Sequence, residues 1–183
     1  VARDMANIFG QAFETLSEFR GVSIAAINGY SMGGGLEVAL ACDIRIAEEH
    51  AQMALPEATV GLLPCAGGTQ NLALLVGEGW AKRMILCGER LTADKALEIG
   101  LVEEVVAKGE GLDAAVALAA KVANQSPVAV AACKKLIQKN RHMPISQALS
   151  EERESFVSLF STQDQKEGVN AFLEKRKPSW SNK

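Results

Sequence analysis

An apolar run that leads into a cluster of glycines constrains this chain more than any other feature of its sequence. Residues 22–27 are apolar almost throughout, and Gly33, Gly34 and Gly35 follow after a short turn. Glycines at the start of a helix let a ligand approach bare backbone N–H groups, whose dipoles sum to partial positive charge. We therefore expect a strand buried on both faces, a turn, and a helix over residues 34–41 that faces an anion or a carbonyl oxygen.

Two glutamates accompany the glycines. Glu37 falls on the first turn of the expected helix, and Glu57 follows Pro56 further along the chain. Each feature alone has an ordinary structural explanation: the glycines could let a helix pack closely on a strand, Glu37 could favour the helix dipole, and Glu57 could cap the next segment. Together they form a much narrower pattern, which suits proton transfer beside a developing enolate.

Length and charge limit the class of protein. With 183 residues the chain has the length of one globular domain, and its first residue is not methionine, so we expect a true N-terminus further upstream. No apolar run approaches the roughly 18 residues of a membrane span, and residues 1–10 contain no signal-peptide core. The formal net charge of −3, with both signs interspersed, argues against a nucleic-acid partner. We expect no membrane partner either.

Cysteine and histidine spacing argues against a metal or disulfide framework. The four cysteines are Cys42, Cys65, Cys87 and Cys133. They form no Cys-x-x-Cys pair, and the two histidines lie far apart in the sequence. We expect no metal ion and a cytoplasmic location, where thiols stay reduced.

Hydrophobic periodicity predicts the other elements. We expect strands at residues 43–47, 52–54 and 101–106, the first of which completes a right-handed strand–helix–strand crossover. Thr92 and Ser126 are the expected N-caps of two helices, and Pro178 is expected to end the last one. Further helices are expected from residue 5 to about residue 20 and at residues 67–75, 80–86, 93–99, 112–124, 127–139 and from 146 onward, with a break near 161–162.

Further motifs lie along the chain: Asn28-Gly29-Tyr30 with the three glycines, and residues 41–47, 55–57, 61–64, 67–70, 100–102, 166–168 and 174–176. In this order they resemble the enoyl-CoA hydratase/isomerase, or crotonase, family from end to end. The resemblance implies a crotonase-like α/β fold, the ClpP/crotonase spiral of ββα units, with an incomplete core over residues 1–124 and a C-terminal helical trimerisation region over residues 125–183. It also implies that the N-terminal part of the domain is absent, including the loop that supplies a second oxyanion N–H.

The resemblance further implies an enoyl-CoA hydratase, which adds water syn across the 2,3 double bond of a 2-enoyl-CoA thioester. Gly34 matches the family's oxyanion N–H donor, and Glu37 and Glu57 match its two catalytic carboxylates. We assign Glu57 as the proton donor to C2 and Glu37 as the group that orients and activates water. No cofactor is expected, because coenzyme A arrives as part of the substrate.

We also assign five residues to substrate binding: Gly33, Pro56, Cys65, Phe156 and Lys175. Cys65 departs from well-known hydratases, which have glycine there, and its side chain could narrow the acyl pocket; a nucleophilic role is disfavoured because no base is evident beside it. Phe156 and Lys175 match positions near the coenzyme A moiety. Lys175 could meet a phosphate or could be an ordinary surface lysine.

Several alternatives stay open from the sequence. Isomerase and thioesterase branches of the family commonly keep one carboxylate or move it, whereas hydratases keep both, so double-bond isomerisation is the nearest rival. A non-catalytic assembly subunit and an RNA-binding relative are rivals of another class. The family builds homotrimers, often paired into hexamers, from its terminal helices; without the resemblance, these helices could equally cover their own subunit's core.

Overall fold

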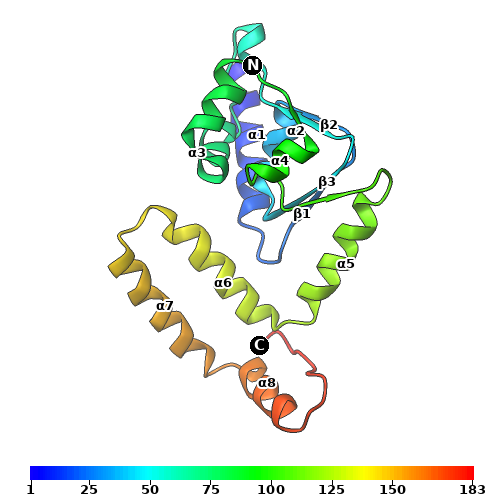
Figure 1. Cartoon of the computed structure of the whole chain (residues 1–183). Helices are drawn as coiled ribbons and strands as arrows, with labels where there is room; N and C mark the ends of the chain where they lie inside the picture. The colour runs from blue at the N-terminus through cyan, green and yellow to red at the C-terminus, as the bar shows by residue number, and fades with distance from the viewer. The chain divides into compact units, whose positions relative to one another are not determined.

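A computed structural model describes residues 1–183, apart from the side chain of His142 (Figure 1). The chain forms two compact units, and each is described by itself. The first comprises Val1–Phe19 and Ser23–Leu118, and the second comprises Arg20–Val22 and Ala119–Lys183. The functional division after residue 124 stays a prediction.

One parallel sheet lies at the centre of the first unit. It consists of β1 (Ile24–Ile27), β3 (Ile44–Glu48) and β6 (Glu104–Val106), in the order β1-β3-β6. The prediction that the first strand is buried on both faces is wrong. Only Ile27 of β1 is buried, because β1 lies at the edge of this sheet and pairs with β3 alone among the strands described.

A second sheet contains two elements that the sequence did not predict. β2 (Tyr30–Met32) runs parallel to β4 (Gln52–Ala54), and β4 pairs antiparallel with β5 (Leu91–Thr92). β2 replaces part of the expected turn before the glycines. With two or three residues, neither β2 nor β5 is long enough to show the alternation by which strands are detected.

Helices follow the predicted positions closely in the first unit. Thr92 caps α4 by accepting the Lys95 N–H, and α3 bends at Gly77, whose φ of 76° and ψ of 163° are not helical. The expected strand at 101–106 is shorter than predicted, because Leu101 and Val102 close α4 with hydrogen bonds to the Ala96 carbonyl. The helices are α1 (Ala2–Ser17), α2 (Gly34–Ala41), α3 (Gly68–Leu86) and α4 (Ala93–Glu98), with the 3₁₀ helix η1 (Glu57–Val60). α5 (Gly111–Ala123) begins in this unit, and its residues from Ala119 onward belong to the second.

The core of the first unit surrounds α2. This helix packs against both α1 and α3 and buries Leu36, Ala39 and Leu40. Its eight residues are apolar apart from the glycines and Glu37, so it has no solvated polar face. Strands and neighbouring helices complete the core with Ile27, Met53, Leu55, Leu72, Met84, Leu91 and Leu101.

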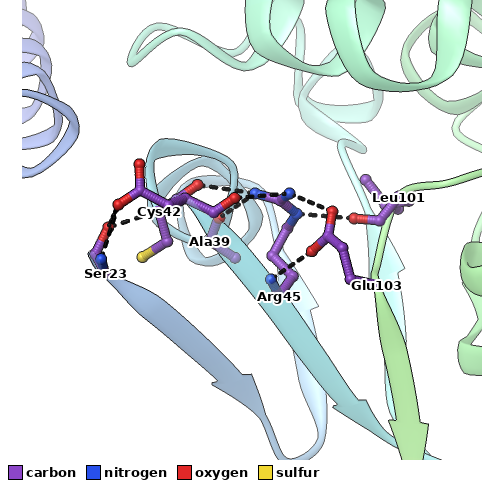
Figure 2. A network of polar contacts seen from close by, with 7 residues as sticks. Ser23, Ala39, Cys42, Arg45, Leu101 and Glu103 are labelled. Atoms are coloured by element: carbon purple, nitrogen blue, oxygen red, sulfur yellow. Dashed lines mark hydrogen bonds and ion pairs between the residues drawn. The ribbon is translucent and has the colours of Figure 1, made fainter. Parts of the chain in front are cut away.

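A buried arginine joins the C-terminal end of α2 to two other segments (Figure 2). Arg45 lies on β3 and is 2% exposed. Its Nη1 donates to the carbonyls of Cys42 (2.8 Å) and Ala39 (3.5 Å), and its Nε donates to the carbonyl of Leu101 (2.9 Å). Glu103 accepts from the Arg45 Nη2 and from its backbone N–H, both at 2.6 Å. These bonds satisfy a charge that would otherwise be costly to bury.

The second unit contains α6 (Pro127–Lys139), the 3₁₀ helix η2 (Asn140–His142), α7 (Ile145–Leu159) and α8 (Gln163–Leu173). Ser126 caps α6 as predicted, and the break between α7 and α8 falls at the predicted place. The helix does not extend to Pro178, however, because α8 ends before Lys175, whose φ is 55°. In the described part of the chain no single helix meets the length and hydropathy of a membrane span, although α5 and α6 together do so across a 108° bend.

Asp164 holds the end of the second unit together. This residue is 1% exposed, and its Oδ1 accepts the backbone N–H groups of Ser181 (2.8 Å) and Asn182 (3.1 Å), while its Oδ2 accepts the Ser126 hydroxyl (3.0 Å). Burial by itself would raise the pKa of Asp164, but the hydrogen bonds outweigh it and leave the pKa below its usual range. The carboxylate therefore ties the final residues to the N-cap of α6.

Candidate active site

The turn from β2 into α2 presents an accessible backbone N–H. Gly33 is the N-cap, with φ of 55° and ψ of −127°, and its N–H donates to the Ala54 carbonyl at 3.0 Å. Gly34 is the first helical residue, so no carbonyl of its own helix can accept its N–H. It is exposed, and a Cβ added there would meet no atom within 4 Å. A ligand atom can therefore approach this N–H directly.

Glu37 is buried beneath that turn, with 3% of its surface exposed. Its Oε1 accepts two backbone N–H groups, from Ala66 at 2.8 Å and from Gly68 at 2.9 Å. Gly68 begins α3, and the close approach requires glycine: a Cβ there would lie 2.8 Å from Pro64 Cβ and 2.9 Å from Glu37 Oε1. The two donors fix the orientation of the carboxyl group.

Glu57 begins η1 directly after Pro56, the N-cap of that 3₁₀ helix. Its Oε1 faces the glycine turn, since a Cβ at Gly33 would lie 3.1 Å from it. Its Oε2 is buried and has no hydrogen-bond partner among the described residues. Burial raises the pKa of the Glu57 carboxyl, and the charge of Glu37 raises it further. Such a group holds its proton more tightly than an ordinary glutamate does, and one of its oxygens is left without a hydrogen-bond partner among the described residues.

The structure thus brings together the predicted residues Gly33, Gly34, Glu37, Pro56 and Glu57. They come from the β2–α2 turn, α2 and η1, and the backbone at the start of α3 supports them. Their roles in catalysis stay predictions. In the part of the chain described here, no three His, Cys, Asp or Glu side chains gather in a way that could hold a metal ion.

Cys65 lies beside this group of residues. It is exposed and lines a cavity of about 270 Å³ together with the adjoining Ala66 and Gly67. The opposite wall comes from α1, including Phe13 and Glu14. The predicted effect of Cys65 on an acyl pocket stays a prediction, and the next residue along, Ala66, holds Glu37 through its backbone N–H.

Phe156 and Lys175 lie in the second unit, and their predicted roles near coenzyme A stay predictions. Phe156 is 62% exposed on α7, and its ring meets that of Phe160 edge-on with 5.2 Å between centroids. Lys175 is exposed just after α8. An aromatic pair with this much exposed surface is more typical of a contact surface than of a folded core.

Sequence reasoning did not identify the residues that hold Glu37. Ala66 and Gly68 act through backbone N–H groups, so their residue types carry almost no signal for this role. The only available signal is the pair Gly67 and Gly68 itself, because consecutive glycines mark close backbone approach. Arg45 was also not singled out, although a charged residue inside an apolar strand predicts a buried partner.

Comparison with known proteins decides the family. The enoyl-CoA hydratase/isomerase family model matches residues 4–183. The chain belongs to this family. The resemblance that the glycine and glutamate motifs indicated is confirmed, and so is the crotonase-like α/β fold.

Other members of the enoyl-CoA hydratase/isomerase family are similar along most of the chain. The 2,3-dehydroadipyl-CoA hydratase of Escherichia coli K12 is 42% identical and covers 93% of this chain. A solved structure of Pseudomonas aeruginosa DspI is 70% identical, with a TM-score of 0.95 over 98% of the chain. A solved enoyl-CoA hydratase from Bacillus anthracis is 38% identical, with a TM-score of 0.96 over 100% of it.

The enoyl-CoA hydratase/isomerase relatives are longer than this chain. It spans 67% of the E. coli hydratase, 68% of the DspI chain and 70% of the B. anthracis chain. Among other curated relatives, the share is as low as 59%. The shared region contains the whole of the glycine turn and both glutamates, since the family model covers residues 4–183.

Proposed function

We propose that this chain acts as an enoyl-CoA hydratase, which adds water syn across the 2,3 double bond of a 2-enoyl-CoA to give a 3-hydroxyacyl-CoA. The observation that carries the proposal is the pair of unlike carboxyl groups beside an exposed helix N-terminus. Glu37 is fixed by two backbone N–H groups, whereas Glu57 has a buried oxygen without a partner and a raised pKa. Hydratase names among the relatives support the same reaction.

The glycine turn receives the thioester carbonyl in this proposal. Negative charge moves onto that oxygen as water attacks C3, and the Gly34 N–H donates to it with the help of the α2 dipole. The open space at Gly34 supports this role, because the thioester can come within hydrogen-bond distance of the backbone. One such donor typically contributes a factor of about 10² or more in rate.

The glutamates divide the proton transfers. Glu37 orients the attacking water and accepts its proton as the oxygen bonds to C3, and Glu57 delivers its own proton to C2 of the enolate. Return of a proton from Glu37 to Glu57 restores the starting state. The raised pKa supports Glu57 as the donor, and the fixed orientation of Glu37 supports its role toward water. This redox-neutral reaction needs no metal or redox cofactor, and coenzyme A enters as part of the substrate.

We propose that the second unit forms the contacts of a homotrimer or hexamer. Its last helices expose apolar side chains that a partner surface would cover. Those side chains are Ile145, Leu149, Phe156, Val157, Phe160, Val169, Phe172 and Leu173.

We also propose a cytoplasmic location. The thiols of Cys65, Cys87 and Cys133 are exposed, and they would be oxidised in an oxidising compartment.

Hydration of crotonyl-CoA, followed as loss of the conjugated thioester absorbance, tests the proposed function. We expect turnover by the chain, and a fall of about 10² to 10⁴ in kcat for both Glu37→Gln and Glu57→Gln. Glu78→Gln, at an exposed ion pair with Lys82, is the matched control and should stay within about twofold. Residual double-bond isomerisation by Glu37→Gln would favour the isomerase reading, and unchanged hydration in both variants would end the hydratase proposal.

A further inference from the structure

Three glycines stand at the N-terminal end of α2, so few side chains hold that end. Gly33, Gly34 and Gly35 carry no side chains, and Gly34 and Gly35 are exposed. This end is held by the burial of Leu36, by the bond from the Gly33 N–H to the Ala54 carbonyl and by the bonds to the Glu37 carboxyl group. A helix held at one end can still tilt, so its direction also depends on what holds the other end.

That other end is held by Arg45. The guanidinium donates to the carbonyls of Cys42 and Ala39, which belong to the last turn of α2 and its C-cap, and so a cation stands at the negative end of the helix dipole (Figure 2). The same planar group donates to the Leu101 carbonyl and to Glu103, which both lie in the segment just before β6. Arg45 thus fixes the last turn of α2 against β3 and the segment that enters β6.

A small tilt at this end moves the reacting groups. The eight residues of α2 span about 12 Å, so a tilt of about 5° displaces the opposite end by about 1 Å. A displacement of 1 Å in a reacting group can cost about 10² in rate. Gly34 lies at the displaced end, and Glu37, the fourth of the eight residues, would move about half as far.

We propose that Arg45 is a positioning residue, which sets the orientation of α2 and thereby the places of the Gly34 N–H and the Glu37 carboxyl group. The proposal rests on the proposed hydratase function for its catalytic consequence. Lysine cannot replace arginine here, because one ammonium group cannot reach three carbonyls and a carboxylate in the fixed fork that the guanidinium provides.

Arg45→Lys tests the proposal, with Arg83→Lys as the matched control. Arg83 makes a two-bond contact with Glu89 at an exposed position on α3, so the control makes the same change in an ion pair that does not touch α2. For each variant we would measure kcat and KM for crotonyl-CoA, the folded fraction, and the amide resonances of Gly34 and Glu37 by nuclear magnetic resonance. We expect Arg45→Lys to lower kcat about 10- to 100-fold, with KM within about threefold and shifted resonances.

The control should keep kcat within about twofold and leave both resonances in place. Equal kcat values in the two variants, or a loss explained entirely by unfolded protein, would overturn the proposal. If the parent chain shows no turnover, the hydratase function fails separately, and the resonances of residues 34 and 37 alone decide whether Arg45 orients α2. If Arg45→Lys does not fold, Glu103→Gln replaces it: a shift of the same resonances supports the proposal, and unchanged resonances contradict it.

Discussion

The Oε1 atom of Glu37 accepts the backbone N–H of Gly68 at 2.9 Å, so a carboxyl group on α2 is held by the first residue of α3. Ala66 adds a second N–H to the same oxygen. Backbone donors are already part of the folded chain and lose no rotamer freedom when they bind, unlike a long side chain. The position of this glutamate therefore depends on how closely two segments approach.

Gly68→Ala tests that approach. The added methyl would lie 2.8 Å from Pro64 Cβ and 2.9 Å from Glu37 Oε1, so either the loop or the carboxyl group must shift. We expect kcat for crotonyl-CoA hydration to fall about 10- to 100-fold. Gly79→Ala, in the same helix with nothing within 4 Å of the new Cβ, should keep its activity and gain up to about 1 kcal/mol of stability. Equal activity in the two variants would show that Glu37 tolerates displacement.

Gly34→Ala separates folding from substrate approach. Because the space around this position is open, the variant should unfold at the same temperature as the parent or slightly above it. The methyl group would nevertheless stand beside the N–H that we assign to the thioester oxygen, and kcat/KM should fall by about 10² or more. Thermal unfolding and steady-state kinetics on one preparation check both parts. Full activity would remove Gly34 from the proposed oxyanion contact.

Glu57→Gln should change stability and activity in opposite directions. The pKa of Glu57 is raised above 4.5, the ordinary value for a glutamate. At pH values above 4.5, the folded chain therefore holds the carboxyl proton of Glu57 more tightly than the unfolded chain does. The resulting stabilisation is complete below that value and is lost as pH rises through the raised pKa. Glutamine removes the cost of ionisation, so the variant should be more stable than the parent near pH 7 and about equally stable near pH 4. Urea unfolding at the two pH values measures this, and a constant difference would contradict it.

Asp164→Asn should loosen the end of the second unit. Oδ1 of Asp164 accepts the N–H groups of Ser181 and Asn182, and Oδ2 accepts the Ser126 hydroxyl, so an amide whose NH₂ group replaces either oxygen loses at least one accepted bond. Loss of a hydrogen bond to a charged group costs about 1.5 to 3 kcal/mol. Trp180, whose Nε1 donates to the Asn124 carbonyl, lies in the affected segment, so its fluorescence should become more accessible to a quencher. Asp113→Asn, at an exposed position in α5, is the control and should leave the quenching unchanged.

The sequence predicted best those features that are set locally. The start of α2 at Gly34 and the caps at Thr92 and Ser126 depend on the residue and its immediate neighbours, and all three are confirmed. The α3 bend at Gly77 was also predicted, within a break expected between residues 76 and 79. Glycine and capping residues act on the backbone at their own position, so the residue type alone indicates the local structure.

Features that depend on distant partners were harder to predict. The half-buried state of β1 follows from its edge position in a sheet, and the short strands β2 and β5 exist only through pairing with β4. In the same way, the motif indicated Glu37 and Glu57 as a pair, but only the structure shows that Ala66 and Gly68 hold Glu37. A pairing partner is a property of the fold, so a local pattern does not contain it.

In the loop that contains Cys65, the main chain and one side chain have different roles. It holds Glu37 through main-chain N–H groups, while the Cys65 side chain borders the neighbouring cavity. Substitutions at position 65 can therefore reshape the cavity and leave the carboxyl group in place. Under the proposed function, substitutions there can alter the substrate cavity one side chain at a time while the carboxyl group that acts on water stays in place.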